Sequence, residues 1–113
     1  RPKSEIRDKR ISASLAYIRE HISGTMEIGQ LADIACMSKD HFIRRFRSEV
    51  GTTPNAYIIQ RKIERAELLL ITTDIPVGDI ADKLDFSDHS YFNRVFKKMV
   101  GCSPRQYRRQ GGS

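Results

Sequence analysis

Residues 28–57 read IGQLADIACMSKDHFIRRFRSEVGTTPNAY, and residues 77–107 read VGDIADKLDFSDHSYFNRVFKKMVGCSPRQY. When the two stretches are aligned with one extra residue in the second loop, glycines, prolines and core aromatic residues recur at the same places. The matched pairs are Gly29 and Gly78, Ala32 and Ala81, Asp33 and Asp82, Ser38 and Ser87, Phe42 and Phe92, Arg44 and Arg94, Phe46 and Phe96, Val50 and Val100, Gly51 and Gly101, Pro54 and Pro104, and Tyr57 and Tyr107. Two copies are too few for a solenoid, which needs at least three stacked repeats. The repeat therefore indicates a duplicated binding module.

Apolar spacing and capping residues predict an all-helical fold. A stripe at intervals of three or four residues predicts a first helix that ends near Gly24; the stripe consists of Ile11, Leu15, Ile18 and Ile22. A short helix over about 28–36 precedes a helix over 39–50. Ser38 can cap this second helix, and Gly51 can close it in the left-handed conformation. No stretch alternates with period two, so we expect no substantial sheet.

Pro54 can begin a long helix that runs to residue 73, because proline fits the first turn of a helix. Its roughly 18 to 20 residues would span about 27 to 30 Å, close to the ~34 Å between successive major-groove faces of DNA. The second copy predicts helices over 77–84, 88–100 and 104–110, with a turn at Asp85 and Phe86 and with Ser87 as the cap. We expect about seven helices. The expected segments are an extension at 1–10, a first unit at 11–57, a linker helix at 54–73, a second unit at 74–110 and a flexible tail at 111–113.

The charge distribution suits a polyanionic partner. Lys and Arg number 20 against 14 Asp and Glu, which gives a net charge of +6. Six cations and no acid occur between Arg94 and Arg109. Cys36 and Cys102 form neither a disulfide framework nor a zinc pattern, so we expect reduced, buried thiols. No apolar run predicts a membrane span or a signal peptide, and we expect a cytoplasmic protein.

The second helix of each unit combines a buried aromatic pair with a polar outward face. Phe42 and Phe46 lie one turn apart, and Arg44 is about 200° away from both. The outward residues are Lys39, Asp40, Ile43, Arg44 and Arg47 in the first unit and His89, Ser90, Asn93, Arg94 and Lys97 in the second. Arginine can pair with guanine and asparagine with adenine, and isoleucine can touch a thymine methyl group. Any soluble helix has a polar face, but the matched arginines favour base reading.

At these residues the sequence resembles the C-terminal DNA-binding domain of AraC/XylS-type transcription regulators, over about residues 6–109. The resemblance is strongest in Ile80-Ala81, Phe86-Ser87-Asp88, Ser90-Tyr91-Phe92, Arg94-Val95-Phe96-Lys97-Lys98, Gly101, Ser103-Pro104 and Tyr107-Arg108-Arg109. Residues of the expected linker helix also match, namely Arg61, Ala66, Leu69-Leu70 and Thr73. The resemblance implies two helix-turn-helix subdomains joined by a long linker helix. Each subdomain would place its second helix in a major-groove segment on one face of the DNA.

The resemblance also implies the roles of individual residues. It assigns base contacts to Asp40, Ile43, Arg44, His89, Ser90, Asn93 and Arg94, and backbone contacts to Lys39, Arg47, Arg61 and Lys97. The implied partners are double-stranded DNA, RNA polymerase and an N-terminal sensing or dimerisation domain, with no cofactor, metal or membrane. Two residues depart from the family pattern. Asp85 replaces the usual turn glycine, and Arg45 replaces an apolar residue, which predicts a looser or partner-facing edge on the first unit.

Other classes of protein explain the sequence less well. The three histidines, the cysteines and the aspartates could supply catalytic or metal-binding groups, but their spacing matches no ligand pattern. A helical protein-interaction module is the main alternative, although it does not account for the matched arginines. RNA binding lacks the aromatic platform or clamp loop of the common modules. We therefore expect a bacterial regulator that binds specific DNA sequences and is not an enzyme.

Overall fold

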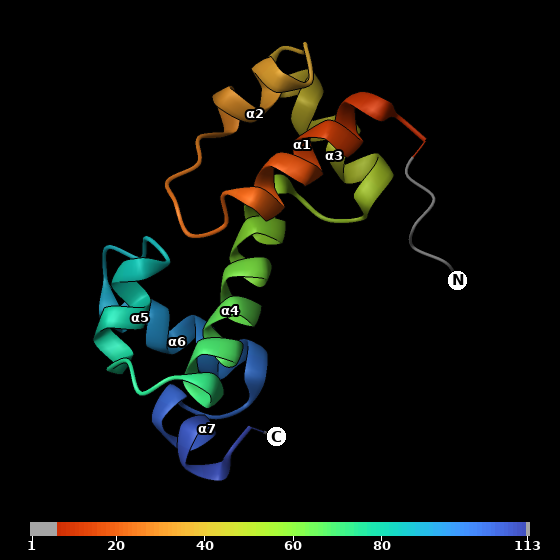
Figure 1. The fold of residues 1–113 in the computed structure, drawn as a ribbon. Coiled ribbons are helices and arrows are strands. Elements are labelled where there is room, and N and C mark those ends of the chain that lie inside the picture. The colour runs from red at the N-terminus through yellow and green to blue at the C-terminus, as the bar shows by residue number, and fades with distance from the viewer. Residues whose placement is uncertain (1–6, 113) are drawn as a thin grey trace. The chain divides into compact units, whose positions relative to one another are not determined.

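The computed structural model describes residues 7–112, and its regular structure is entirely helical within these residues (Figure 1). The elements are α1 (Lys9–Glu20), α2 (Ile28–Ile34), α3 (Lys39–Val50), α4 (Pro54–Thr72), α5 (Val77–Lys83), α6 (His89–Val100) and α7 (Pro104–Gln110). They confirm the all-helical expectation. The chain divides into two compact units, the first up to Ile59 and the second from Gln60 onward, so the boundary falls within α4.

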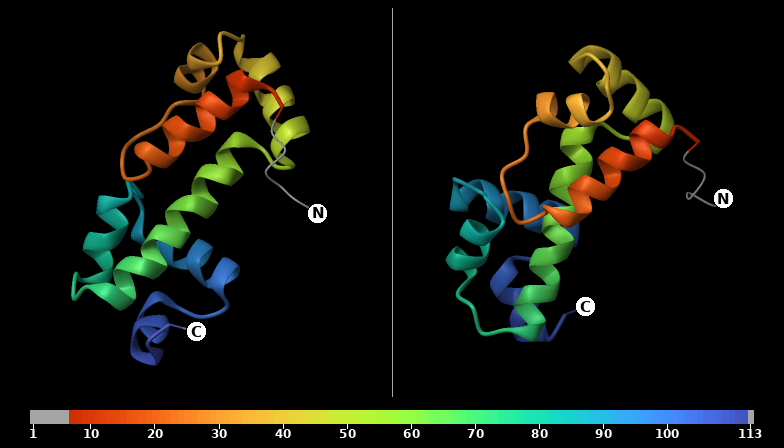
Figure 2. Two further views of the ribbon diagram at one scale, coloured as in Figure 1. Left: turned by 45° about the vertical axis from the view of Figure 1, so that its right-hand side comes forward. Right: turned by 45° about the horizontal axis from the view of Figure 1, so that its top comes forward.

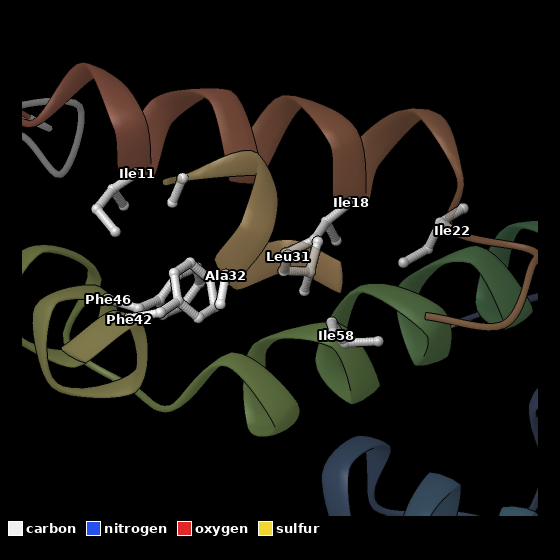
Figure 3. Packing of buried hydrophobic residues seen from close by; sticks show 9 residues of the cluster. Ile11, Ile18, Ile22, Leu31, Ala32, Phe42, Phe46 and Ile58 are labelled. Carbon is white, nitrogen blue, oxygen red and sulfur yellow. The ribbon is translucent and has the colours of Figure 1, made fainter. Parts of the chain in front are cut away.

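The first unit is built from α1, α2, α3 and the start of α4. In both views of Figure 2, α2 and α3 lie beside α1. Figure 3 shows Ile11 of α1 above Phe42 and Phe46 of α3 and Ile18 of α1 beside Leu31 of α2, with Ile58 of α4 on the opposite side from α1. Both phenylalanines are fully buried. Burial of such side chains stabilises a domain by about 1.5 to 3 kcal/mol each, and this fixes the outward face of α3.

The second unit repeats the aromatic packing of the first. The ring centroids of Phe46 and Tyr57 lie 5.7 Å apart at an interplanar angle of 70°, and those of Phe96 and Tyr107 lie 5.6 Å apart at 76°. These are edge-to-face pairs, a favourable arrangement for aromatic rings. In both views of Figure 2, α5, α6 and α7 gather around the C-terminal part of α4. The duplicated sequence therefore corresponds to duplicated packing.

The turn between α2 and α3 and the turn between α5 and α6 each contain a residue in the left-handed conformation. Cys36 has φ 57° and Asp85 has φ 63°, although neither is glycine. The following amide donates back across each turn, from Met37 to the Ala32 carbonyl at 2.9 Å and from Phe86 to the Ala81 carbonyl, also at 2.9 Å. This is the hydrogen-bond pattern of a Schellman motif. The turn at Asp85 is confirmed, but the expected burial of the two cysteines is wrong, because Cys36 is exposed and Cys102 is half-buried.

The cap of α6 differs from the prediction. Asp88, not Ser87, occupies the N-cap position, and its carboxylate accepts hydrogen bonds from the amides of Ser90 at 2.8 Å and Tyr91 at 3.3 Å. The alignment of the two copies favoured Ser87, because Ser87 is aligned with Ser38, which does cap α3. A carboxylate is an equally good cap and also interacts favourably with the helix dipole. The extra residue of the second unit therefore lies in the turn.

The ends of the chain also differ from the expected boundaries. Asp8 caps α1, so Lys9 and Arg10 are helical and do not belong to an extension; residues 1–6 of that expected extension lie outside the described residues. The first helix ends at Glu20, before the expected stop at Gly24. At the other end, Gly112 donates to the Tyr107 carbonyl at 3.0 Å and so closes α7. Of the expected tail, only Ser113 is not described.

Candidate nucleic-acid interface

The outward face of α3 carries most of the expected contact residues of the first unit. Lys39, Asp40, Arg44 and Arg47 are exposed. Ile43, the apolar residue of this set, is half-buried. This face exists because the fully buried phenylalanines of α3 occupy the opposite side of the helix.

An ion-pair network holds the C-terminal half of α3 against the start of α1. Arg45 donates to Asp8 at 3.0 Å and lies 3.4 Å from Glu49. Glu49 also accepts hydrogen bonds from the backbone amides of Arg7 at 2.9 Å and Asp8 at 3.2 Å. Hydrogen bonds from the Arg10 and Arg45 guanidinium groups hold the pKa of the Asp8 carboxyl well below its usual range. Arg45 therefore fixes this edge of the first unit, contrary to the prediction of a looser edge.

The outward face of α6 is polar and exposed. His89, Ser90, Asn93, Arg94 and Lys97 all lie on the surface, opposite the fully buried Phe92 and Phe96. Arg44 and Arg94 therefore have the same relation to the buried aromatic pair in the two units. The predicted reading residues of each unit come together on one face of one helix.

Two of the α6 side chains have internal partners. The His89 Nε2 atom lies 2.8 Å from Asp82 Oδ1, and a Cβ atom added at Gly78 would approach the His89 ring to 3.1 Å. The absence of a side chain at Gly78 thus leaves room for this ring. The guanidinium carbon of Arg94 lies 5.8 Å from the centre of the Tyr91 ring, within the range of a cation–π contact. His89 and Arg94 therefore each have a side-chain contact on or beside their own helix.

Some of the basic side chains already have partners within the chain. Arg61, expected to contact the DNA backbone, forms an ion pair with Glu64 at 2.6 Å. Arg108 donates to the carbonyls of Leu70 at 3.0 Å and Thr73 at 3.1 Å, and so caps the C-terminus of α4. Sequence reasoning placed Arg108 in a run of cations and in the family signature, but assigned it no contact. A cap that joins residues 38 positions apart leaves no local sequence signal.

Lys62 is a second residue that sequence reasoning missed. Only 7% of its surface is exposed, although its helix position carries no sign of this in the sequence. Burial lowers the pKa of the Lys62 ammonium group, and the charge of Asp85 opposes this effect. The left-handed turn residue of the second unit therefore also supplies the opposite charge that a buried lysine needs.

Neither a membrane span nor a metal cluster occurs in the part of the chain that the structure describes. None of the helices in residues 7–112 has the length and apolar character needed to cross a bilayer. Histidine, cysteine, aspartate and glutamate side chains in the same range form no group of three or more that could hold a metal ion.

Two helix-turn-helix units with exposed second helices define a class of protein, the double helix-turn-helix DNA-binding domain. A family model described as a helix-turn-helix domain matches residues 31–110. The chain belongs to this family in its AraC/XylS-type form.

Relatives of known role share this domain. The chain is 37% identical to the MmsAB operon regulatory protein of Pseudomonas aeruginosa over 95 residues, which cover 84% of this chain and 31% of the relative. It is 32% identical to the arabinose operon regulatory protein of Escherichia coli K12 over 102 residues, or 89% of this chain and 35% of the relative. The chain thus spans about a third of the length of these relatives.

Solved structures show the same fold. The DNA-binding domain of AdpA, a global transcriptional factor in complex with a target DNA, is 31% identical and superposes with a TM-score of 0.85 over 89% of this chain and 91% of that one. The C-terminal domain of AraT, a response regulator from Geobacillus stearothermophilus, is 28% identical with a TM-score of 0.87 over 95% and 88% of the two chains. Both comparisons confirm the expected fold class.

Proposed function

We propose that this chain is the DNA-reading part of a bacterial transcription regulator and that α3 and α6 each enter a segment of the major groove of double-stranded DNA. The observation that carries the proposal is the repeated placement of an exposed arginine opposite a buried phenylalanine pair, Arg44 in α3 and Arg94 in α6. Packing requires no exposed arginine at either position. A guanidinium group can donate two parallel hydrogen bonds to guanine in the major groove.

The neighbouring side chains supply complementary base-reading groups. Asn93 can pair with adenine, and the half-buried Ile43 can touch a thymine methyl group with its exposed part. His89 can donate or accept at the ring nitrogen that does not face Asp82. The remaining proposed base contacts are Asp40 and Ser90. Asp40 is the only acidic residue of this set, and the phosphates repel its carboxylate. We propose that its role is to reject wrong bases.

Exposed cations border the two reading faces and suit phosphate contacts. We assign this role to Lys39, Arg47 and Lys97. Arg61 belongs to the same set, but a phosphate must compete there with Glu64, so its contribution should be smaller. Together these residues predict a log–log salt slope of roughly minus three to minus four.

The wider role of the full protein extends this proposal. Relatives that contain this domain are operon regulatory proteins about three times its length, which supports a sensing or dimerisation domain elsewhere in the full protein. A regulator that activates transcription must also contact RNA polymerase, and it would act in the cytoplasm at the nucleoid. A role as a protein-interaction module is compatible with these functions but does not account for Arg44 and Arg94.

Selection of bound sites from a random duplex library tests the proposal. The wild-type chain should select a defined sequence, and repeated selections with Arg44→Ala and Arg94→Ala should each relax preference in a different block of positions. Each substitution should cost about 1 to 3 kcal/mol of specific affinity. Failure of the wild-type chain to select any sequence would refute the proposal. Identical effects of the two substitutions would refute two separate reading helices.

A further inference from the structure

A hollow lies beside the proposed reading face of the second unit. Its volume is about 360 Å³, and it is bordered by the starts of α5, α6 and α7. Two of the proposed base-reading residues, His89 and Asn93, line it. The remaining lining residues are Val77, Gly78, Ala81, Phe92, Ser103, Pro104 and Arg105. Whatever occupies this hollow is therefore adjacent to the groups that would meet the bases.

The charge of this region favours an anion. A second hollow of about 500 Å³ shares Val77 and Arg105 with the first and is also lined by Pro76, Arg108 and Arg109. No Asp or Glu of the described chain lines either hollow, although the Asp82 carboxylate lies 2.8 Å from the lining residue His89. Arg108 already donates to the carbonyls at the end of α4. Arg105 is exposed and is the cation common to both hollows.

We propose that Arg105 binds a phosphodiester of the DNA backbone, at the strand that borders the groove segment read by α6. This inference rests on the proposed function. Side chains that reach base edges in the major groove lie beside the phosphates of the bordering strand. His89 and Asn93 share a hollow with Arg105, so a duplex that meets those two side chains brings a phosphate to its guanidinium group. A guanidinium group can hold a phosphate through two parallel hydrogen bonds.

The first unit supplies a matched control. Pro54 and Pro104 each begin a helix at the same place in their units, and the residue that follows is Asn55 in the first and Arg105 in the second. Both residues are exposed. Asn55 carries no charge, so the proposed contact belongs to the second unit alone.

The first experiment is a salt titration with the selected duplex and a random duplex, monitored by fluorescence anisotropy. Arg105→Ala should weaken binding to both duplexes by similar factors and make the log–log salt slope shallower by about one. Asn55→Ala should leave the slope unchanged. The thermal unfolding midpoints of both variants should match that of the wild-type chain, because both side chains are exposed.

The second experiment locates the contact. Single phosphates of the selected duplex are replaced in turn by neutral methylphosphonates. One replacement, next to the bases whose preference changes in Asn93→Ala, should weaken binding by the wild-type chain. The same replacement should weaken binding by Arg105→Ala no further.

The outcomes separate this inference from the proposed function. An unchanged slope for Arg105→Ala, with salt-dependent and specific binding by the wild-type chain, would overturn the Arg105 contact and leave the DNA-reading role intact. A shallower slope with undiminished sensitivity at every methylphosphonate position would overturn the localised contact and assign Arg105 only a diffuse electrostatic effect. Absence of DNA binding by the wild-type chain would overturn both proposals.

Discussion

The turn of the second unit provides the most demanding stability prediction. Asp85 and Cys36 hold matched left-handed conformations, with φ values of 63° and 57°. A residue with a side chain in this region costs about 1 to 2 kcal/mol, and aspartate less than most. Glycine removes that cost but gives the unfolded chain more freedom, which offsets about 0.4 to 1 kcal/mol. Cys36→Gly should therefore raise the free energy of unfolding by about 0.5 to 1 kcal/mol.

The same substitution at Asp85 should have the opposite effect on the free energy of unfolding. Asp85→Gly also relieves the turn, but it removes the carboxylate whose charge raises the pKa of the buried Lys62. Removal of one interaction partner of a buried polar group costs about 1 to 3 kcal/mol, more than the turn gains. We expect a net loss of about 1 kcal/mol, measured as a shift of the urea midpoint by circular dichroism at pH 7.

The pH dependence identifies the cause. Burial lowers the pKa of Lys62 in the folded protein below its unfolded value, so between these two values the unfolded chain binds more protons and stability rises with pH. Without Asp85 this pKa falls further and the rise becomes larger. The difference in the free energy of unfolding between the wild-type chain and Asp85→Gly should therefore shrink from pH 7 to pH 10. An equal deficit at both pH values, or stabilisation equal to that of Cys36→Gly, would refute the role of Lys62.

Three further predictions concern the cores and the surface. Phe46→Ala and Phe96→Ala should each lower the free energy of unfolding by about 3 to 5 kcal/mol in urea titrations, because both rings are fully buried, and a loss below 1 kcal/mol would contradict that burial. Arg94→Ala should cost no more than about 1 kcal/mol of stability, the value of an exposed cation–π contact with Tyr91, and a melt as early as that of Phe96→Ala would show that Arg94 is a packing residue. Asp8→Asn should make the free energy of unfolding fall less steeply at acid pH. The lowered carboxyl pKa of Asp8 gives stabilisation that is present above about pH 4 and disappears as the pH falls. The same dependence of the free energy of unfolding on acid pH in Asp8→Asn and the wild-type chain would exclude this contribution.

The sequence predicted the helices because their signals are local. Ser38 and Gly51 bound α3 as expected, and Pro104 begins α7. One or both ends of α1, α2, α4, α5 and α6 moved by one to four residues, and competing polar caps account for the starts of α1 and α6. Asp88 replaced Ser87 at α6, and Asp8 extended α1 toward the N-terminus. Competing caps of similar strength differ by a few tenths of a kcal/mol, and tertiary packing decides between them.

The outward faces of α3 and α6 were also predictable from the sequence. Helical periodicity sets the direction of each side chain once the buried pair is known, and Phe42 with Phe46 identified that pair. The exposed positions of Arg44 and Arg94 follow from this rule. Their contacts with DNA remain proposals, because periodicity places a side chain on a surface and does not show what it binds.

By itself, the sequence determined the duplication, the all-helical class and the buried phenylalanine pairs, because repeats, caps and helical periodicity depend on local patterns in the sequence. Only the tertiary structure decided which polar residues become partners across the chain. Arg45 meets Asp8, 37 residues away, and Arg108 meets the Leu70 carbonyl, 38 residues away. The burial of Lys62 was decided in the same way. These contacts depend on how helices distant in sequence pack together, and no local pattern of residue types encodes that arrangement.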